Sequence, residues 1–300
     1  MILQTSYSDQ IQTVLTLIGT VDSEGSQNCN SLNQARGGYR KFLASLGQRE
    51  IETTSCEVSF ITHEDDAAKL RQYFSNDSLL DDKQQAAVIE ISQDGEVNEK
   101  KSRIKQALQE LSLYSPDYAA IVRTVVTDIF ILPSRVAKGG STSQAIGLIW
   151  ANPKTAYTTA DIVEMLIHEF THHAMFLDEL RYKHYSYEMV MDRSTWARSA
   201  ILNASRPLDK VLHSIVVATE VLLFRKYHLG HPTNPRVHPP TDLMIEQLDE
   251  SILSTESAIS SNDFIFHERA ADLLRNARQI LENEFLPLHR NLTRNFKRVS

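Results

Sequence analysis

The chain of 300 residues is long enough for one large domain or two small ones with a sizeable buried core. Hydrophobic residues make up 42% and charged residues 23%, which excludes a disordered chain, while 10 Gly and 9 Pro exclude collagen-like and low-complexity architectures. The formal net charge of −7 argues against a broad nucleic-acid-binding surface.

The lack of membrane-spanning and secretory features in the sequence favours the cytoplasm. No run approaches the roughly 18 apolar residues that a membrane helix needs, and the start, MILQTSYSDQ, lacks the basic and apolar regions of a secretory signal. The two cysteines, Cys29 and Cys56, cannot form a disulfide framework, which fits a reducing compartment. We therefore expect a soluble, cytoplasmic protein that binds neither nucleic acid nor membrane.

The N-terminal part of the chain has a mixed pattern. Apolar spacing predicts helices over Ser31–Leu46 and Glu64–Phe74, and a short β-prone run over Ala86–Ile91. A helix over Lys100–Tyr114 follows, and a second one is expected to begin at Pro116 with Ser115 as its N-cap.

The best internal boundary is the polar, turn-rich stretch SQDGEVNEK that begins at Ser92. It divides the chain into an N-terminal α/β segment of unclear role, residues 1–97, and a region of residues 98–300. The two could also form one continuous domain.

The second region begins with strands and then becomes helical. Asp128–Pro133 and Gln144–Trp150 are expected to be strands, separated by a flexible loop, KGGSTS. Apolar residues at helical spacing then predict four helices, over 159–180, 208–227, 242–260 and 262–284. The pattern indicates an α+β fold, mostly helical, with a small sheet against a helix-rich C-terminal half.

The sequence HEFTH, residues 168–172, is an HExxH motif within a segment that is expected to form an amphipathic helix. Residues four apart share one helix face, so His168 and His172 can bind one metal ion. Glu169 is rotated from that face by about 100° and can reach a metal-bound water or orient a ligand. This zincin-like helix suits a metal-dependent hydrolase or an iron oxygenase.

Two residues close to the motif have less specific expected roles. His173 is expected to be a polar residue on the helix face rather than a metal ligand. Glu164 lies one turn before His168 and either accepts the ring N–H of that histidine or is solvated.

A catalytic site needs a third ligand, for which three residues compete. Asp178 has the metzincin spacing, but Met175 replaces the turn-forming glycine and the helical pattern continues, which points Asp178 away from the histidines. His213 and Glu220 share one face of the predicted 208–227 helix about 10 Å apart, so only one can bind the same ion. Glu220 would supply a charge-neutralising carboxylate, and His213 the more frequent ligand type.

The stretch LIHEFTHH and the later SRPLDKVLHSIVVATEVLLF resemble the 2-oxoglutarate-dependent HExxH-type peptide β-hydroxylases found with ribosomal peptide biosynthesis. In that family a strand leads into the HExxH helix, and an Arg-Pro-Leu opens a second helix that carries a Leu-His pair. The corresponding elements are Ile146–Trp150, His168–His172, Arg206–Leu208 and Leu212-His213. The resemblance covers residues 144–229.

The resemblance implies that His168, His172 and His213 bind Fe(II), with Glu169 as an essential neighbour. It also implies 2-oxoglutarate as cosubstrate and hydroxylation of an amino acid residue in a peptide or natural-product pathway.

A guanidinium would suit the distal carboxylate of the cosubstrate. Arg206 is the first candidate because it belongs to the matched motif, and Arg198 and Arg225 are alternatives.

The alternative function is a gluzincin-like zinc metallopeptidase. His168, His172 and Glu220 would bind zinc, with Glu169 as general base on the zinc-bound water. The strand Ile146–Trp150 would then be the edge that pairs with an extended peptide, a role that would serve a peptide hydroxylase equally well. Glu220 and the run SIVVATEV depart from the hydroxylase pattern.

Overall fold

The computed structural model describes residues 7–74, 96–134, 137–262 and 264–289. The predicted β-prone run Ala86–Ile91 lies outside these residues. The chain divides into two compact units, which we call the N-terminal unit (residues 4–181) and the C-terminal unit (residues 182–300, together with 1–3). The boundary expected near residue 97 falls inside the N-terminal unit.

The N-terminal unit contains a small mixed sheet. Its strands are β1 (Ser59–Ile61), β2 (Asp128–Ile131), β3 (Gly139–Gly140) and β4 (Leu148–Ala151), in the spatial order β1-β2-β4-β3. β1, β2 and β4 are parallel, and β3 is antiparallel to β4. All residues of β2 and β4 are buried, as expected for apolar strands covered on both faces.

Two expectations about this sheet are wrong. β4 cannot be the edge strand, because it pairs with β2 on one side and β3 on the other. The KGGSTS segment is also not simply a flexible loop: its two glycines form β3, and Ser141 is buried. Main-chain pairing with β4 supplies an order that the local sequence does not signal.

Helices surround this sheet, and most lie where the apolar spacing predicts them. Their bounds are α1 (Tyr7–Gly19), α2 (Ser23–Gln27), α3 (Leu32–Ser45), α4 (Glu64–Leu70) with the 3₁₀ turn η1 (Arg71–Phe74), α5 (Val97–Tyr114), α6 (Pro116–Val125), the 3₁₀ turn η2 (Ser143–Ala145) and α7 (Thr159–Arg181). The hydroxyl of Ser115 accepts a hydrogen bond from the amide N–H of Tyr118, which confirms the predicted N-cap.

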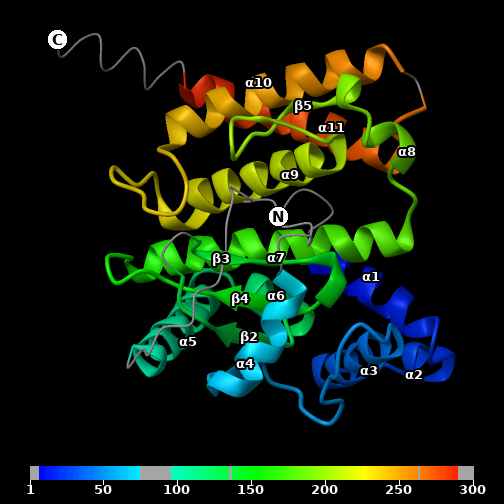
Figure 1. Cartoon of the computed structure of the whole chain (residues 1–300), viewed down its shortest axis with the longest axis vertical. Coiled ribbons are helices and arrows are strands. Elements are labelled where there is room, and N and C mark those ends of the chain that lie inside the picture. The colour runs from blue at the N-terminus through cyan, green and yellow to red at the C-terminus, as the bar shows by residue number, and fades with distance from the viewer. Residues whose placement is uncertain (1–6, 75–95, 135–136, 263, 290–300) are drawn as a thin grey trace. The chain divides into compact units, whose positions relative to one another are not determined.

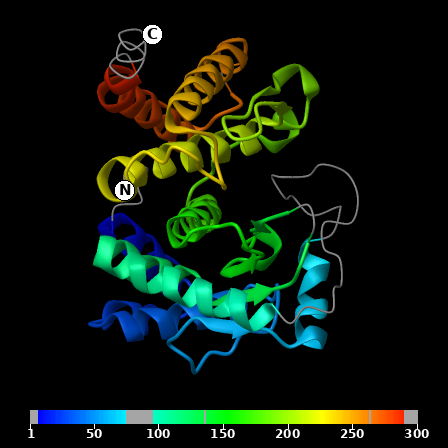
Figure 2. The same cartoon turned by 90° about the vertical axis from the view of Figure 1, so that its left-hand side faces the viewer.

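The HExxH motif lies on α7, which packs against α5 and β3 (Figure 1). Figure 2 views α7 nearly end-on, with α5 running below it. Every residue of α7 from Ile162 to Asp178 is buried, so the expected amphipathic character is wrong. The motif therefore lies on a helix buried on all sides, where its polar side chains need partners.

The C-terminal unit is also mainly helical. Its elements are α8 (Tyr187–Val190), the 3₁₀ turn η3 (Arg193–Thr195), β5 (Ala197–Arg198), β6 (Ser205–Arg206), α9 (Leu208–Phe224) with the π-helical turn η4 (Arg225–Leu229), α10 (Thr241–Ser260) and α11 (Glu268–Ile280) with the π-helical turn η5 (Leu281–Phe285). β5 and β6 form an antiparallel pair, and α9 packs on α10 and α11.

One helix of this unit begins later than the apolar spacing predicts. The helix expected from residue 262 begins only at Glu268. Phe266 forms a β-bridge with Tyr185, and the amide N–H of His267 donates to the carbonyl of His184. These pairings with a distant segment hold Phe266 and His267 outside the helix, and His267 has an extended backbone conformation.

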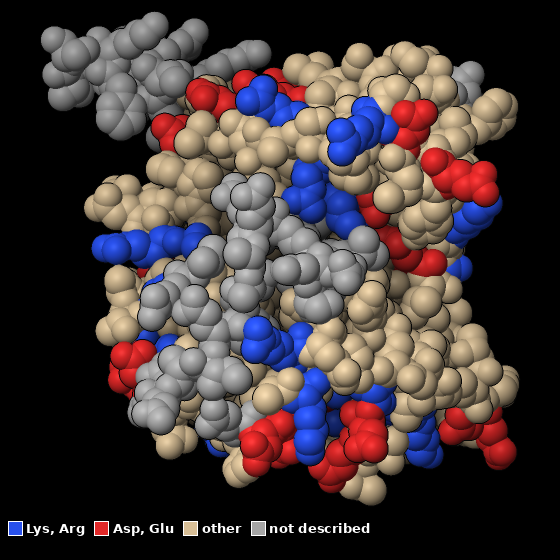
Figure 3. All heavy atoms as spheres, viewed as in Figure 1, with Lys and Arg blue, Asp and Glu red and all other residues tan. Residues whose placement is uncertain are grey.

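The fold is α+β and mostly helical, as the sequence predicts. Among the residues that the structure describes, no helix is long and apolar enough to span a membrane. Lys and Arg side chains are interspersed with Asp and Glu on the face shown in Figure 3.

Candidate metal centre

The two histidines of the motif meet at their Nε2 atoms. The distance from His168 Nε2 to His172 Nε2 is 3.2 Å, and both side chains are buried. Two imidazole nitrogens bound to one ion at about 2.0–2.1 Å would lie about 2.8–3.4 Å apart, for angles between octahedral and tetrahedral values. One shared metal ion therefore fits this pair. In the metal-free neutral pair, one Nε2–H can donate to the other ring.

Glu169 is buried beside the pair and is held from the strand side. Ser141 Oγ donates to Glu169 Oε2 at 2.7 Å and also contacts the main-chain carbonyl of Glu169 at 3.2 Å. Ser141 follows β3, so the carboxylate of Glu169 faces the β3 side of α7. Glu169 is thus buried, and its contact with Ser141 is one that the motif does not reveal.

A glycine in β3 lets this strand pack closely on β4 beside the carboxylate. A Cβ atom at Gly139 would lie 2.8 Å from the carbonyl oxygen of Trp150 and 3.4 Å from Glu169 Oε1. Only glycine lets β3 approach β4 this closely, whereas the distance to Glu169 Oε1 is that of an ordinary contact. No local sequence signal marks this approach, because two adjacent glycines have no side chains to pattern.

His173 is not a polar surface residue, contrary to the sequence-based expectation. It is fully buried, and its Nδ1 accepts the amide N–H of Gly147 at 3.2 Å. Burial, with a smaller contribution from the charge of Arg49, lowers the pKa of His173 to about 3. His173 is therefore neutral and joins α7 to the start of β4.

A buried ion pair lies close to the contact between His173 and Gly147. Arg49 Nη2 donates to Asp128 Oδ2 at 2.6 Å and to Thr127 Oγ1 at 2.8 Å, and the Thr127 hydroxyl contacts the carbonyl oxygen of Gly147 at 3.1 Å. The beginnings of β2 and β4 are thus joined by polar contacts on the side where His173 is anchored. Nothing in the motif itself predicted these residues.

The remaining acidic residues of α7 are also buried. Glu164 is only 4% exposed, so the solvated alternative for this residue is wrong. α7 continues without a break to Arg181, as predicted, which turns Asp178 about 120° around the helix axis from His172. This is the physical reason why Asp178 does not complete a metzincin-type site.

The other candidate ligands belong to the C-terminal unit. His213 and Glu220 are both buried on α9. Within the described residues, no group of three or more His, Cys, Asp or Glu side chains comes together to hold a metal ion. The structure therefore brings together His168 and His172, while the third ligand stays a prediction.

The three candidate arginines differ in their surroundings. Arg206 is half-buried in β6, directly before Pro207, the N-cap of α9. Arg198 is exposed and pairs with Glu250 at 3.5 Å. Arg225 is fully buried, and its Nη1 donates to the carbonyl of Pro239 at 2.8 Å.

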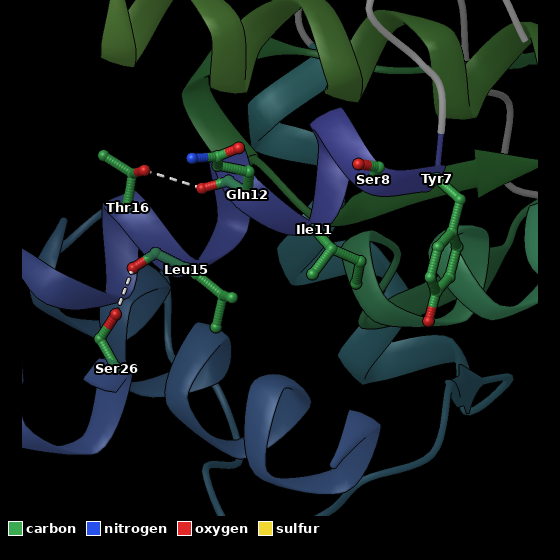
Figure 4. Close-up of a pocket in the computed structure, with 7 residues that line it drawn as sticks. All are labelled: Tyr7, Ser8, Ile11, Gln12, Leu15, Thr16 and Ser26. Carbon is green, nitrogen blue, oxygen red and sulfur yellow. Dashed lines mark hydrogen bonds between the residues drawn. The ribbon is translucent and has the colours of Figure 1, made fainter. Parts of the chain in front are cut away.

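A surface pocket lies apart from the motif, on α1 and α2 (Figure 4). Tyr7, Ile11 and Leu15 line it, and the hydroxyl of Ser26 donates to the carbonyl of Leu15 at 2.7 Å. Its lining contains no histidine, cysteine or carboxylate, so the pocket offers no metal ligand of these types.

Comparison with protein families and with curated proteins identifies no relative. No protein-family model matches the chain, and none of the curated proteins searched matches it. The resemblance to HExxH-type hydroxylases therefore rests on the motif residues alone.

Proposed function

We propose that this protein is a metal-dependent enzyme whose centre is built on His168 and His172. The approach of the two buried Nε2 atoms to 3.2 Å is the observation that supports this most directly. Two imidazoles with this spacing suit zinc or iron, with Glu169 buried beside them.

Within this class, we propose a non-heme Fe(II)/2-oxoglutarate-dependent dioxygenase of the cytoplasm. It would hydroxylate an unactivated carbon of an amino acid residue, in a peptide or natural-product pathway. The motif order supports this: the Arg-Pro-Leu sequence leads directly into α9, and His213 lies on that helix. When bound, Fe(II) and 2-oxoglutarate would supply the oxidising chemistry, with succinate as coproduct.

The residues have separate roles in this proposal. His168, His172 and His213 would hold the metal, and Glu169 would orient groups beside it. Arg206 would bind the distal carboxylate of 2-oxoglutarate through paired N–H donors. The buried surroundings of the histidine pair would exclude bulk water.

A zinc metallopeptidase is the second candidate, and two observations favour it. Glu220 is a buried carboxylate on α9, which would complete a two-histidine, one-glutamate ligand set. β3 is the last strand of the described sheet and lies beside Glu169. An extended peptide paired with β3 would be near Glu169, which would then act as the general base toward water.

The first test is anaerobic reconstitution with Fe(II), followed by measurement of succinate from 2-oxoglutarate under air. His172→Ala should abolish turnover, Glu169→Gln should reduce it, and replacement of the exposed His63 by Gln serves as the matched control. Succinate formation that depends on His172 would support the dioxygenase. Absence of succinate, with bound zinc and Glu169-dependent peptide cleavage, would support the peptidase instead.

A further inference from the structure

The short segment Gly139–Ser141 lies against the carboxylate of Glu169 and contacts it through Ser141. Ser141 Oγ donates to Oε2 at 2.7 Å, and the space that a Cβ at Gly139 would fill lies 3.4 Å from Oε1. The same hydroxyl contacts the main-chain carbonyl of Glu169. The segment therefore holds both the backbone and the side chain of this residue.

We propose that Ser141 is a positioning residue that holds the carboxylate of Glu169 in one orientation beside the histidine pair. This inference rests on the proposed function, because it gives Glu169 a role at the metal. It applies to either proposed reaction, since both need this carboxylate to be held in place.

The physical argument begins with the freedom of the glutamate side chain. A glutamate has three side-chain torsions, and the exact position of its oxygens is set only by their contacts. Glu169 is 4% exposed, so bulk water cannot supply those contacts. A hydrogen bond from a hydroxyl to a buried carboxylate is charge-assisted and short, as the 2.7 Å distance shows.

β3 supplies the rigidity that a positioning residue needs. The preceding residue, Gly140, pairs with Trp150 in the centre of β4, so Ser141 is held by the sheet. Trp150 is itself fixed, because its indole N–H donates to the carbonyl of Leu132 at 2.8 Å. Hydrogen-bond partners that orient groups at a metal site typically contribute about 10–100-fold to activity.

The test compares four single variants with a double variant. Ser141→Ala removes the hydroxyl, Ser141→Thr keeps one, and Ser143→Ala removes a hydroxyl two residues away. The fourth single variant is Glu169→Gln, which is also combined with Ser141→Ala in the double variant. The measurements are succinate formation or peptide cleavage, the dissociation constant for Co(II), and the visible absorption spectrum of bound Co(II).

A positioning role predicts a specific pattern. Ser141→Ala should lower turnover about 10–100-fold and leave Co(II) affinity within about twofold. Its Co(II) spectrum should change in the same way as that of Glu169→Gln. In the double variant, Ser141→Ala should have no further effect, because both changes act through one carboxylate. Ser141→Thr should restore part of the turnover, and Ser143→Ala should behave as the unchanged protein.

Other results would overturn the inference. The inference fails if Ser141→Ala has the turnover of the unchanged protein. It also fails if the losses of turnover from Ser141→Ala and Glu169→Gln multiply in the double variant. Equal loss of Co(II) affinity and turnover would assign Ser141 to the fold instead. The proposed function fails separately, if the unchanged protein binds no Co(II) through His172. If Co(II) binds but no substrate is turned over, the visible spectrum of bound Co(II) still tests the role of Ser141. A spectrum that changes in Glu169→Gln but not in Ser141→Ala would contradict that role.

Discussion

Replacing Gly147 with alanine tests how closely the strand and helix layers pack behind the HExxH helix. Gly147 has a positive φ of +85°, which costs a residue with a Cβ about 1–2 kcal/mol. The new Cβ would lie 2.9 Å from Leu43 Cδ1 and 2.9 Å from Thr127 Oγ1. Overpacking of this kind costs about 1–3 kcal/mol more. We therefore expect Gly147→Ala to lower the free energy of unfolding by about 2–5 kcal/mol.

Gly47 provides a matched control, because it has a similar φ of +66° with no atom within 4 Å of the added Cβ. Gly47→Ala should cost only the backbone strain, about 1–2 kcal/mol. The assay is urea unfolding followed by tryptophan fluorescence. Trp150 and Trp196 are the only tryptophans of the chain, so a Trp196→Phe background makes Trp150 report on the N-terminal unit. Equal losses for the two glycine variants would refute the argument from crowding.

Three further predictions concern stability. Gly37 lies inside α3 with open space at its Cβ position, so Gly37→Ala should raise the free energy of unfolding by about 0.5–1 kcal/mol in the same urea assay. The lowered pKa of His173 keeps it neutral in the folded state, so stability should fall as the pH drops from 6.5 toward 3, by about 2 kcal/mol at pH 5. His173→Gln should remove that loss from urea titrations at pH 7.5 and 5, whereas an unchanged slope would contradict the assignment. Burial, reinforced by Asp161, raises the pKa of Tyr157 to about 12, so stability should fall as the pH rises from 10 toward 12. Tyr157→Phe should flatten that decline in thermal melts, and a wild-type decline in the variant would count against it.

The local sequence predicts the elements that carry the site with good accuracy. The apolar spacing over residues 159–180 matches α7, which spans Thr159–Arg181. The Ser115-Pro116 pair marks the start of α6 because a hydroxyl cap and a fixed proline φ act within a few residues. The i, i+4 spacing of His168 and His172 likewise predicts their shared face, since helix geometry alone sets it.

Other features depend on contacts between segments far apart in the chain. The pairing of Gly139–Gly140 with β4 has no local signal, because two glycines have high conformational freedom and no side chains to pattern. The interior position of β4 depends on which strands flank it, which its own sequence does not encode. Polar residues on α7 suggest a solvated face, but their partners come from other elements, such as Ser141 for Glu169.

The sequence by itself determined where the helices begin and end around the motif, and which two histidines can share a metal ion. These are short-range properties of helix geometry, capping and side-chain spacing. Only the tertiary structure decided that α7 is buried, that Ser141 holds Glu169, and that His173 anchors α7 to the strand layer. The physical reason is that burial and hydrogen-bond partners arise when distant segments pack together, and no single segment specifies them.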